Sequence, residues 1–199
     1  MATDLHRARL DTVVQSLLAS GAQVIADLGC GHGELIEQLR DHEQFSLILG
    51  IDIDSQSLVR ARDRLCLNIF SQDSRLRVLA GSFENSDWAE VAIDAAVMLE
   101  TIEHIDPGRL SRVERAIFGH IKPRIVLITT PNKEYNVLHG MSPEDKRHPG
   151  HQFEWTRAQF KSWCEGVAQR NCYEVSFQDI GPCDPLRGSS TQMAQFSRS

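Results

Sequence analysis

Two carboxylates and an imidazole stand within five consecutive residues, Glu100-Thr101-Ile102-Glu103-His104. They directly follow the apolar run Ala-Ala-Val-Met-Leu at 95–99, which is typical of a buried parallel strand. Ligands of open α/β sheets bind beyond the carboxyl ends of strands, so these side chains would lie where chemistry is done. Carboxylate and imidazole groups are also ligands of divalent cations. Taken alone, the segment is equally typical of a solvated acidic turn, so the rest of the chain must decide.

A glycine-rich segment near the amino terminus predicts a cofactor site. The β-prone run 24–28 contains Asp27 and is followed at once by Gly-Cys-Gly-His-Gly at 29–33 and a helical pattern. Strand, glycine turn and helix begin a nucleotide-binding α/β domain, because glycine lets the backbone approach a ligand closely. The next apolar run, 47–53, carries Asp52 about 20 residues later, where a carboxylate can bind both hydroxyls of a ribose. A turn or capping role is the alternative for Asp52.

The hydrophobic pattern supplies the elements that would position these groups. A leading helix, which Asp4 can cap and Gly21 ends, is followed by β/α alternation. Asp54 or Ser55 is the expected cap of the third helix, and Thr156 opens a capping box. Strands are expected at 24–28, 47–53, 76–80, 95–99, 125–129, 173–177 and 191–196. This order predicts an α/β fold with a doubly wound, mostly parallel seven-stranded sheet, helices on both faces and a closing antiparallel pair.

Composition limits the classes of function. The chain has 199 residues, a net charge of -6 and a pI of about 5.7, which argues against a protein that grips a long phosphate backbone. No apolar run approaches the roughly 20 residues of a membrane span, and the amino terminus lacks a signal-peptide pattern. Five scattered cysteines, an odd number, favour a reduced protein over a disulfide framework. We therefore expect a cytoplasmic protein that does not contact membranes.

A long irregular segment, 133–150, separates the fifth expected strand from the capping box at Thr156. Segments of this kind in compact domains are usually functional or disordered. It leads into Arg147-His148 and His151, and His151 taken alone is more typical of a core histidine than of a ligand. Paired with the segment 100–104, His151 is instead favoured as a ligand, whereas His148 is more typical of a loop residue than of a catalyst.

The combined motifs resemble a known family. Asp27-x-Gly29-x-Gly31, with an acidic end to the second strand, resembles class I S-adenosylmethionine-dependent methyltransferases. Four further segments in order resemble the small-RNA 3′-terminal ribose 2′-O-methyltransferases, which are named after the plant protein HUA enhancer. These segments are Glu-Thr-Ile-Glu-His at 100–104, Thr-Pro-Asn-Lys-Glu-Tyr-Asn at 130–136, Arg-His-Pro-Gly-His-Gln-Phe-Glu-Trp-Thr-Arg at 147–157 and Thr-Gln-Met-Ala at 191–194. The resemblance covers roughly residues 20 to 196.

The resemblance implies a role for each matching position. The implied ligands and catalytic residues are Glu100, Glu103, His104 and His151. The implied S-adenosylmethionine site contains Asp27, Gly29, Gly31 and Asp52, with Ser82 and Phe83 near its adenine. Asn132, Arg147 and His148 are weaker candidates for contact with the substrate. The family pattern has an acidic residue directly before its last metal-binding histidine, and this chain has Gly150 there.

The resemblance also implies a reaction and its participants. One divalent cation would bind the 2′ and 3′ hydroxyls of the terminal ribose of an RNA, and the 2′-hydroxyl would receive the methyl group. We expect Mg²⁺ or Mn²⁺, with Co²⁺, Fe²⁺ and Zn²⁺ as alternatives suited to mixed ligands. Protein partners would be factors of small-RNA loading in gene silencing, or of RNA repair. A single Rossmann-like class I methyltransferase domain would span 1–199, divided into a leading helix (1–21), a cofactor-binding core (22–131), a metal and substrate loop (132–155) and closing helix and strands (156–199).

Two other functions fit parts of the sequence. A methyltransferase acting on a small-molecule diol would share the cofactor half and could also bind paired oxygens through a metal. A binding module that holds S-adenosylmethionine or RNA without turnover is the non-enzymatic alternative. The segment 147–157 argues against the first, and the intact set of ligands and glycines argues against the second.

Overall fold

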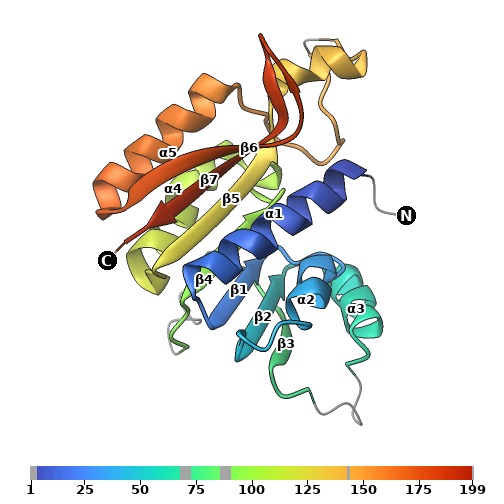
Figure 1. Cartoon of the computed structure of the whole chain (residues 1–199), viewed down its shortest axis with the longest axis vertical. Helices are drawn as coiled ribbons and strands as arrows, with labels where there is room; N and C mark the ends of the chain where they lie inside the picture. Colours follow the sequence, from blue (N-terminus) through green and yellow to red (C-terminus); the bar gives the residue numbers. More distant parts are fainter. Residues whose placement is uncertain (1–3, 68–72, 86–90, 143, 199) are drawn as a thin grey trace.

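The computed structural model describes residues 4–67, 73–85, 91–142 and 144–198. Figure 1 shows a central twisted sheet with helices on both sides and a long carboxy-terminal hairpin at one edge. The strands are β1 (Val24–Leu28), β2 (Leu47–Asp52), β3 (Leu76–Ala80), β4 (Ala95–Leu99), β5 (Ile125–Pro131), β6 (Glu174–Asp184) and β7 (Gly188–Ser197). The α-helices are α1 (Asp4–Ser20), α2 (Glu34–Leu39), α3 (Ser55–Arg64), α4 (Leu110–Glu114) and α5 (Arg157–Asn171). No helix among these residues is long and apolar enough to cross a membrane.

The seven strands form one sheet in the order β3-β2-β1-β4-β5-β7-β6. Strands β1 to β5 pair with one another in parallel, and β7 runs antiparallel to both β5 and β6. The predicted α/β fold, its mostly parallel seven-stranded sheet and its antiparallel closing pair are therefore confirmed. Because β1 and β4 are neighbours at the point where strand order reverses, their carboxyl ends border the crevice in which such sheets bind ligands.

Alternating residues of each strand pack into separate layers on the two faces. Ile25 belongs to the layer covered by α1, α2 and α3, whereas Ala26 and Leu28 belong to the layer covered by α4 and α5. A strand buried on both faces needs a continuous apolar run, which is why the expected strands could be recognised from composition.

Several element boundaries differ from the sequence-based expectation. α1 already includes Asp4, and the residues before it lie outside those described. β2 ends at Asp52, so Ile53 is exposed. Between β4 and β5 the chain forms a succession of short helical pieces, which are η3 (Pro107–Arg109), α4 and the π-helix η4 (Arg115–Ile121), and the side chain of Asp106 caps η3. Both closing strands are longer than expected, because their hairpin extends beyond the edge of the sheet.

The irregular segment after β5 is pinned at both ends. It opens with the 3₁₀ helix η5 (Lys133–His139), whose cap is the side chain of Asn132. Asn132 and Trp155 form a parallel bridge, in which the Lys133 amide donates to the Trp155 carbonyl at 3.0 Å. α5 then begins with the predicted capping box of Thr156 and Gln159. The loop 132–155 is consequently closed on itself beside the carboxyl end of β5.

Candidate active site

The glycine turn after β1 is organised by the end of β2. Gly29 and Gly31 have φ angles of 83° and 51°, a backbone region that favours glycine. The Gly31 amide donates to Oδ2 of Asp52 at 2.8 Å, and the Asp54 amide donates to Oδ1 at 2.8 Å. Asp54 in turn caps α3. Asp52 therefore fixes the glycine turn and has its remaining acceptor capacity available for a ligand.

Asp27 is the most deeply buried carboxylate of this cofactor half. It is 2% exposed, and burial together with the charge of Asp52 raises its pKa to about 7. A cationic ligand would favour the ionised form of such a group. The predicted cofactor, a sulfonium that also carries an ammonium group, is a ligand of that kind.

One cavity of about 660 Å³ joins the predicted cofactor residues to the predicted chemistry. All six predicted cofactor residues line it, namely Asp27, Gly29, Gly31, Asp52, Ser82 and Phe83. Glu100, His104 and His148 line the same cavity. His6, Cys30, His32, Glu34 and Arg109 also line it and were not predicted from the sequence. The carboxyl ends of β1, β2 and β4 meet here, as expected for a switch point in strand order.

The turn after β4 sends its two carboxylates inward. Glu100 has a φ of 52°, a left-handed conformation that is uncommon for a residue with a side chain. Its amide donates to the carbonyl and the hydroxyl oxygens of Thr129 at 3.2 and 3.0 Å. The 3₁₀ helix η2 (Ile102–His104) then places Glu103 at 0% exposure and leaves His104 at the surface.

Each of the two glutamates has one satisfied and one unsatisfied oxygen. Oε2 of Glu100 lies 2.8 Å from Nη2 of Arg9, and Oε2 of Glu103 accepts from the Thr130 hydroxyl at 3.0 Å. Oε1 of each is buried and has no hydrogen-bond partner among the described residues. Burial raises the pKa of both carboxyls, and the charge of Glu100 raises that of Glu103 further. Unpaired buried carboxylate oxygens are unfavourable unless a cation or a donor binds them.

In two nearby histidines, His104 and His151, Nδ1 has a hydrogen-bond partner that leaves Nε2 as the nitrogen with the lone pair. His151 is buried, with Nδ1 2.6 Å from Oε1 of Glu154 and Nε2 3.9 Å from Oε1 of Glu103. Nδ1 of His104 donates to the Gly150 carbonyl at 3.2 Å. Metal-binding histidines commonly donate one ring nitrogen to a carboxylate or carbonyl and coordinate with the other. By the chemistry of their donor atoms, two carboxylates and two oriented imidazoles, Glu100, Glu103, His104 and His151 fit a divalent cation.

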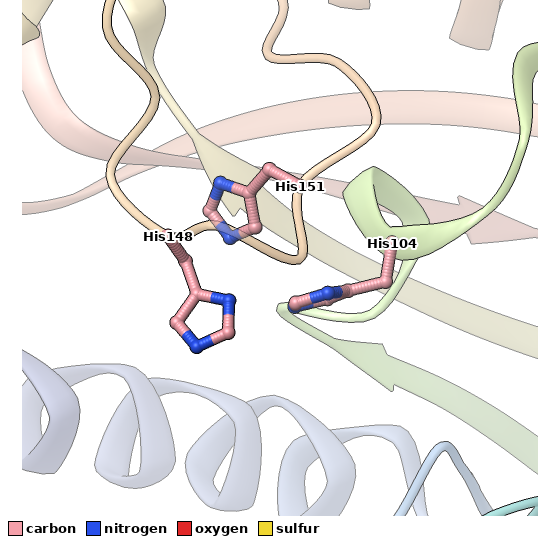
Figure 2. A group of neighbouring side chains, drawn as sticks. All are labelled: His104, His148 and His151. Carbon is pink, nitrogen blue, oxygen red and sulfur yellow. The ribbon is translucent and has the colours of Figure 1, made fainter.

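His148 is the third imidazole of the group in Figure 2. Ligand atoms of His104, His148 and His151 all lie within 4.8 Å of one another. His104 comes from the turn after β4, and the other two come from the loop 132–155. The structure thus brings together side chains that are separated by more than 40 residues in the sequence.

Asn132 and Arg147 differ from the expectation that they contact substrate. Asn132 is fully buried, and its side-chain amide donates to the carbonyls of Arg187 and Ser189 at 2.8 and 2.9 Å. Arg147 donates to Asn136 Oδ1 at 2.6 Å and, from its two terminal nitrogens, to the carbonyls of Ser190 and Asn132 at 2.9 and 2.8 Å. Both polar ends are used within the protein, where they hold the loop 132–155 against β7.

Sequence reasoning missed Arg9 and Glu154. Arg9 belongs to α1 and also donates from Nε to the Thr191 hydroxyl of β7 at 2.8 Å. Burial alone would raise the pKa of Glu154, but hydrogen bonds from His151, Asn136 and the Arg147 amide outweigh it and lower the pKa to about 2. A glutamate three residues after a candidate ligand was the one visible signal for Glu154, and a lone arginine on a helix gave none for Arg9.

Comparisons with known proteins identify the family of this chain. The family described as "Methyltransferase domain" matches residues 26–127. The chain is 32% identical over 185 residues to a small RNA 2′-O-methyltransferase of Xenopus tropicalis, covering 87% of this chain and 49% of that protein. It is 27% identical over 212 residues to a small RNA 2′-O-methyltransferase of Arabidopsis thaliana, covering 98% of this chain and 22% of that protein.

A solved structure matches the chain over its whole length. The methyltransferase domain of bacterial CtHen1-CN superimposes with a TM-score of 0.88 at 36% identity, covering 98% of this chain and 100% of that one. The chain therefore spans half or less of the curated relatives above, but the whole of a methyltransferase domain solved by itself.

Proposed function

The chain belongs to the small RNA 2′-O-methyltransferase family, and we propose that it transfers a methyl group from S-adenosylmethionine to the 2′-hydroxyl of the 3′-terminal ribose of an RNA. The relatives named above are small RNA 2′-O-methyltransferases by name, and this chain has a cavity for the cofactor and a candidate site for the acceptor next to it. Metal dependence is part of the proposal.

The pair of unsatisfied oxygens on Glu100 and Glu103 is the observation that carries the proposal. Both oxygens are buried, that of Glu103 lies 3.9 Å from Nε2 of His151, and both glutamates belong to a turn whose first residue lines the cofactor cavity. A folded protein keeps such oxygens only where a ligand stabilises them or where their strain serves a function. A divalent cation on Glu100, Glu103, His104 and His151 would satisfy both.

The bound cation would supply Lewis-acid chemistry and a template for two neighbouring hydroxyls. This chain's own residues supply the rest. Glu154 orients His151, the Gly150 carbonyl orients His104, and Arg9 holds Glu100. Asp52 and the glycine turn would hold the donor, so that its methyl group and the acceptor oxygen meet in one cavity.

The acceptor we propose is the 3′-terminal nucleotide of an RNA and not the internal nucleotides along its strand. Only a 3′-terminal ribose with two free hydroxyls offers the vicinal oxygens that this donor set would accept, which excludes DNA and 3′-phosphorylated ends. The net charge of -6 agrees with a protein that handles one nucleotide closely.

Methyl transfer from labelled S-adenosylmethionine to a short RNA tests the proposal. The RNA is compared with the same sequence ending in a 2′-deoxy sugar, each with Mn²⁺ or with a chelator. We expect label in the ribose of the first RNA with Mn²⁺ alone. Label in small-molecule diols but in no RNA end would reject the RNA substrate, and equal labelling with chelator would reject the metal.

A further inference from the structure

Three imidazoles surround one space beside the cofactor cavity, and by residue type each could be a ligand, a base or a hydrogen-bond donor. Figure 2 shows the rings of His104, His148 and His151 turned around this space. What distinguishes the three rings is the partner of Nδ1 in each. A neutral imidazole has one N–H and one lone pair, so a bond at one nitrogen fixes the chemistry of the other.

The backbone of Gly150 accepts a hydrogen bond from one of the rings and donates a hydrogen bond to another. Its carbonyl oxygen accepts from Nδ1 of His104 at 3.2 Å, which leaves the lone pair of that ring on Nε2. Its amide donates to Nδ1 of His148 at 3.0 Å, which uses the Nδ1 lone pair and leaves the hydrogen of that ring on Nε2. One residue therefore prepares His104 to bind a cation and His148 to donate a hydrogen bond.

In His151, as in His104, Nδ1 donates a hydrogen bond and the lone pair is left on Nε2. Its Nδ1 lies 2.6 Å from the buried carboxylate of Glu154, which accepts the N–H, and its Nε2 faces Glu103. Since Glu154 also accepts hydrogen bonds from Asn136 and the Arg147 amide, this arrangement is held from several sides. His148 is consequently the one ring of the three whose Nδ1 accepts a hydrogen bond and whose Nε2 carries the hydrogen.

We infer that His148 is a specificity residue that donates from Nε2 to an oxygen of the RNA's 3′-terminal nucleotide, and is neither a metal ligand nor the base. This inference rests on the proposed function. His148 is exposed and lines the cavity together with Glu100 and His104, so its ring lies where the terminal nucleotide must enter. A cation or a hydroxyl proton needs a lone pair, which this ring has already used, whereas ribose and phosphate oxygens accept hydrogen bonds.

The absence of a side chain at position 150 is part of this arrangement. A Cβ built there would lie 3.0 Å from Nδ1 of His148 and 3.1 Å from Nδ1 of His104. Both contacts are tighter than nine in ten real ones, so with a larger residue one ring or the other would have to shift by a few tenths of an ångström. Glycine keeps its own amide and carbonyl close enough to bond both rings.

Two substitutions separate the three roles. His148→Gln keeps an N–H donor but removes the imidazole, and His148→Leu removes the donor as well. RNA affinity is measured by fluorescence anisotropy with Mn²⁺ and S-adenosylhomocysteine, Mn²⁺ affinity by electron paramagnetic resonance, and S-adenosylhomocysteine affinity by calorimetry. We expect His148→Leu to weaken RNA binding by about two- to tenfold and the RNA affinity of His148→Gln to stay within about twofold of wild type. The affinities for Mn²⁺ and for S-adenosylhomocysteine should be unchanged in both variants.

Other results would overturn the inference. Loss of Mn²⁺ affinity in both variants would make His148 a ligand, and loss of kcat in both at unchanged RNA affinity would make it the base. Weaker binding of S-adenosylhomocysteine would assign the hydrogen bond to the cofactor. Equal RNA affinity of all three proteins, while the wild type methylates RNA ends, would reject this inference and leave the proposed function standing; a wild type that methylates no RNA end would reject the proposed function.

The acceptor oxygen is identified with two altered RNAs. One ends in a 3′-deoxy sugar, and the other has an uncharged methylphosphonate as its last linkage. The difference between wild type and His148→Leu should vanish with the RNA that lacks the accepting oxygen and persist with the other. A difference that persists with both would exclude the 3′-hydroxyl and the anionic phosphate oxygen as the acceptor. Thermal unfolding of each variant checks that the loop substitution leaves the fold intact.

Discussion

Arg9 of the first helix holds Glu100, with 2.8 Å between Nη2 and Oε2. The two side chains are 13% and 17% exposed, and Nε of Arg9 is anchored on Thr191. With the proposed divalent cation bound, two buried carboxylates, one guanidinium and the cation would sum to a single positive charge, which the negative charge developing on an attacking hydroxyl would neutralise. The leading helix thereby takes part in the electrostatics of the site.

Removal of Arg9 should weaken both the fold and the cation site. Arg9→Ala leaves Glu100 buried without its partner, and we expect a loss of about 2 kcal/mol in the free energy of unfolding and weaker Mn²⁺ binding. Arg9→Lys should recover only part of this, because an ammonium lacks the planar fork that reaches Thr191 and Glu100 together. Urea unfolding and Mn²⁺ resonance measure the two effects. The exposed Arg7 on the same helix is the control, and equal losses in Arg7→Ala would contradict the assignment.

Replacement of Glu103 should stabilise the metal-free protein. Glu103→Gln removes a carboxylate whose pKa is raised well above its ordinary value of 4.5, first by burial and then by Glu100. In chelator we expect the melting temperature of the variant to exceed that of wild type by about 3 °C, which corresponds to roughly 1 kcal/mol. Mn²⁺ should raise the melting temperature of wild type but not of the variant.

The sign of the pH dependence follows from the same group. An acid with a raised pKa in the folded state is penalised when it ionises, so stability falls as the pH rises above the unfolded value. Metal-free wild type should therefore lose stability relative to Glu103→Gln as the pH increases from 4.5. A wild type that stays more stable than the variant in chelator at neutral pH would show that Glu103 has a partner there.

Glu154 should act on the cation through His151. Glu154→Gln removes the carboxylate that accepts from Nδ1, and loss of such partners typically lowers metal affinity about 10- to 100-fold. Affinity for S-adenosylhomocysteine should be unchanged, because Glu154 does not line the cofactor cavity. The exposed Glu174 provides a matched substitution, Glu174→Gln, with no expected effect. Unaltered Mn²⁺ affinity in Glu154→Gln would mean that the hydrogen bond from Nδ1 of His151 to Glu154 is not required for Mn²⁺ binding.

The sequence predicted those parts of the site that follow from strand order. Asp27, Asp52 and Glu100 each stand at the end of an apolar run, and parallel strands bring such ends to one edge of a sheet. A continuous apolar run is sufficient for this prediction, because a strand buried on both faces admits few polar residues. The resemblance to a family added His151, which no local pattern distinguishes from a core histidine.

What could not be predicted depends on contacts between distant elements. Arg9 reaches the site only because α1 crosses the sheet toward β7, and it bonds Thr191 at a separation of 182 residues. Asn132 and Arg147 stand where a substrate contact is plausible by type, yet a closed loop has its own buried carbonyls to satisfy. Whether such a side chain turns inward or outward is decided by tertiary packing, and nothing in the local sequence records it.

Cofactor affinity should depend on pH through Asp27. Burial and Asp52 raise its pKa to about 7, and the cationic cofactor favours the ionised form. Binding of S-adenosylmethionine should therefore weaken as the pH falls below 7, by up to about tenfold per unit. Calorimetry from about pH 5.5 to about pH 8 measures this dependence of the affinity on pH. Asp27→Asn should bind more weakly at neutral pH and lose the dependence; a variant that keeps the same dependence would assign it to another group.

The last prediction concerns the link between the cofactor turn and the cation site. A Cβ at Gly29 would overlap the side chain of Thr101, which lies between Glu100 and the η2 turn, and the new residue would also have to adopt a φ of 83°. Gly29→Ala should therefore shift the turn that carries Glu100 and Glu103 and weaken Mn²⁺ binding as well as cofactor binding.

Gly31 separates this coupling from backbone strain. It has a φ of 51°, but a Cβ at this position would have nothing within 4 Å, so Gly31→Ala carries strain of about 1 kcal/mol without a clash. We expect Gly31→Ala to retain Mn²⁺ affinity and Gly29→Ala to lose it by about tenfold or more, since displaced ligands lose their geometry. Resonance titration of Mn²⁺ in both variants, without cofactor, provides the comparison. If the two alanines reduce Mn²⁺ affinity equally, strain in the glycine turn explains the effect, and Thr101 does not connect the two halves of the site.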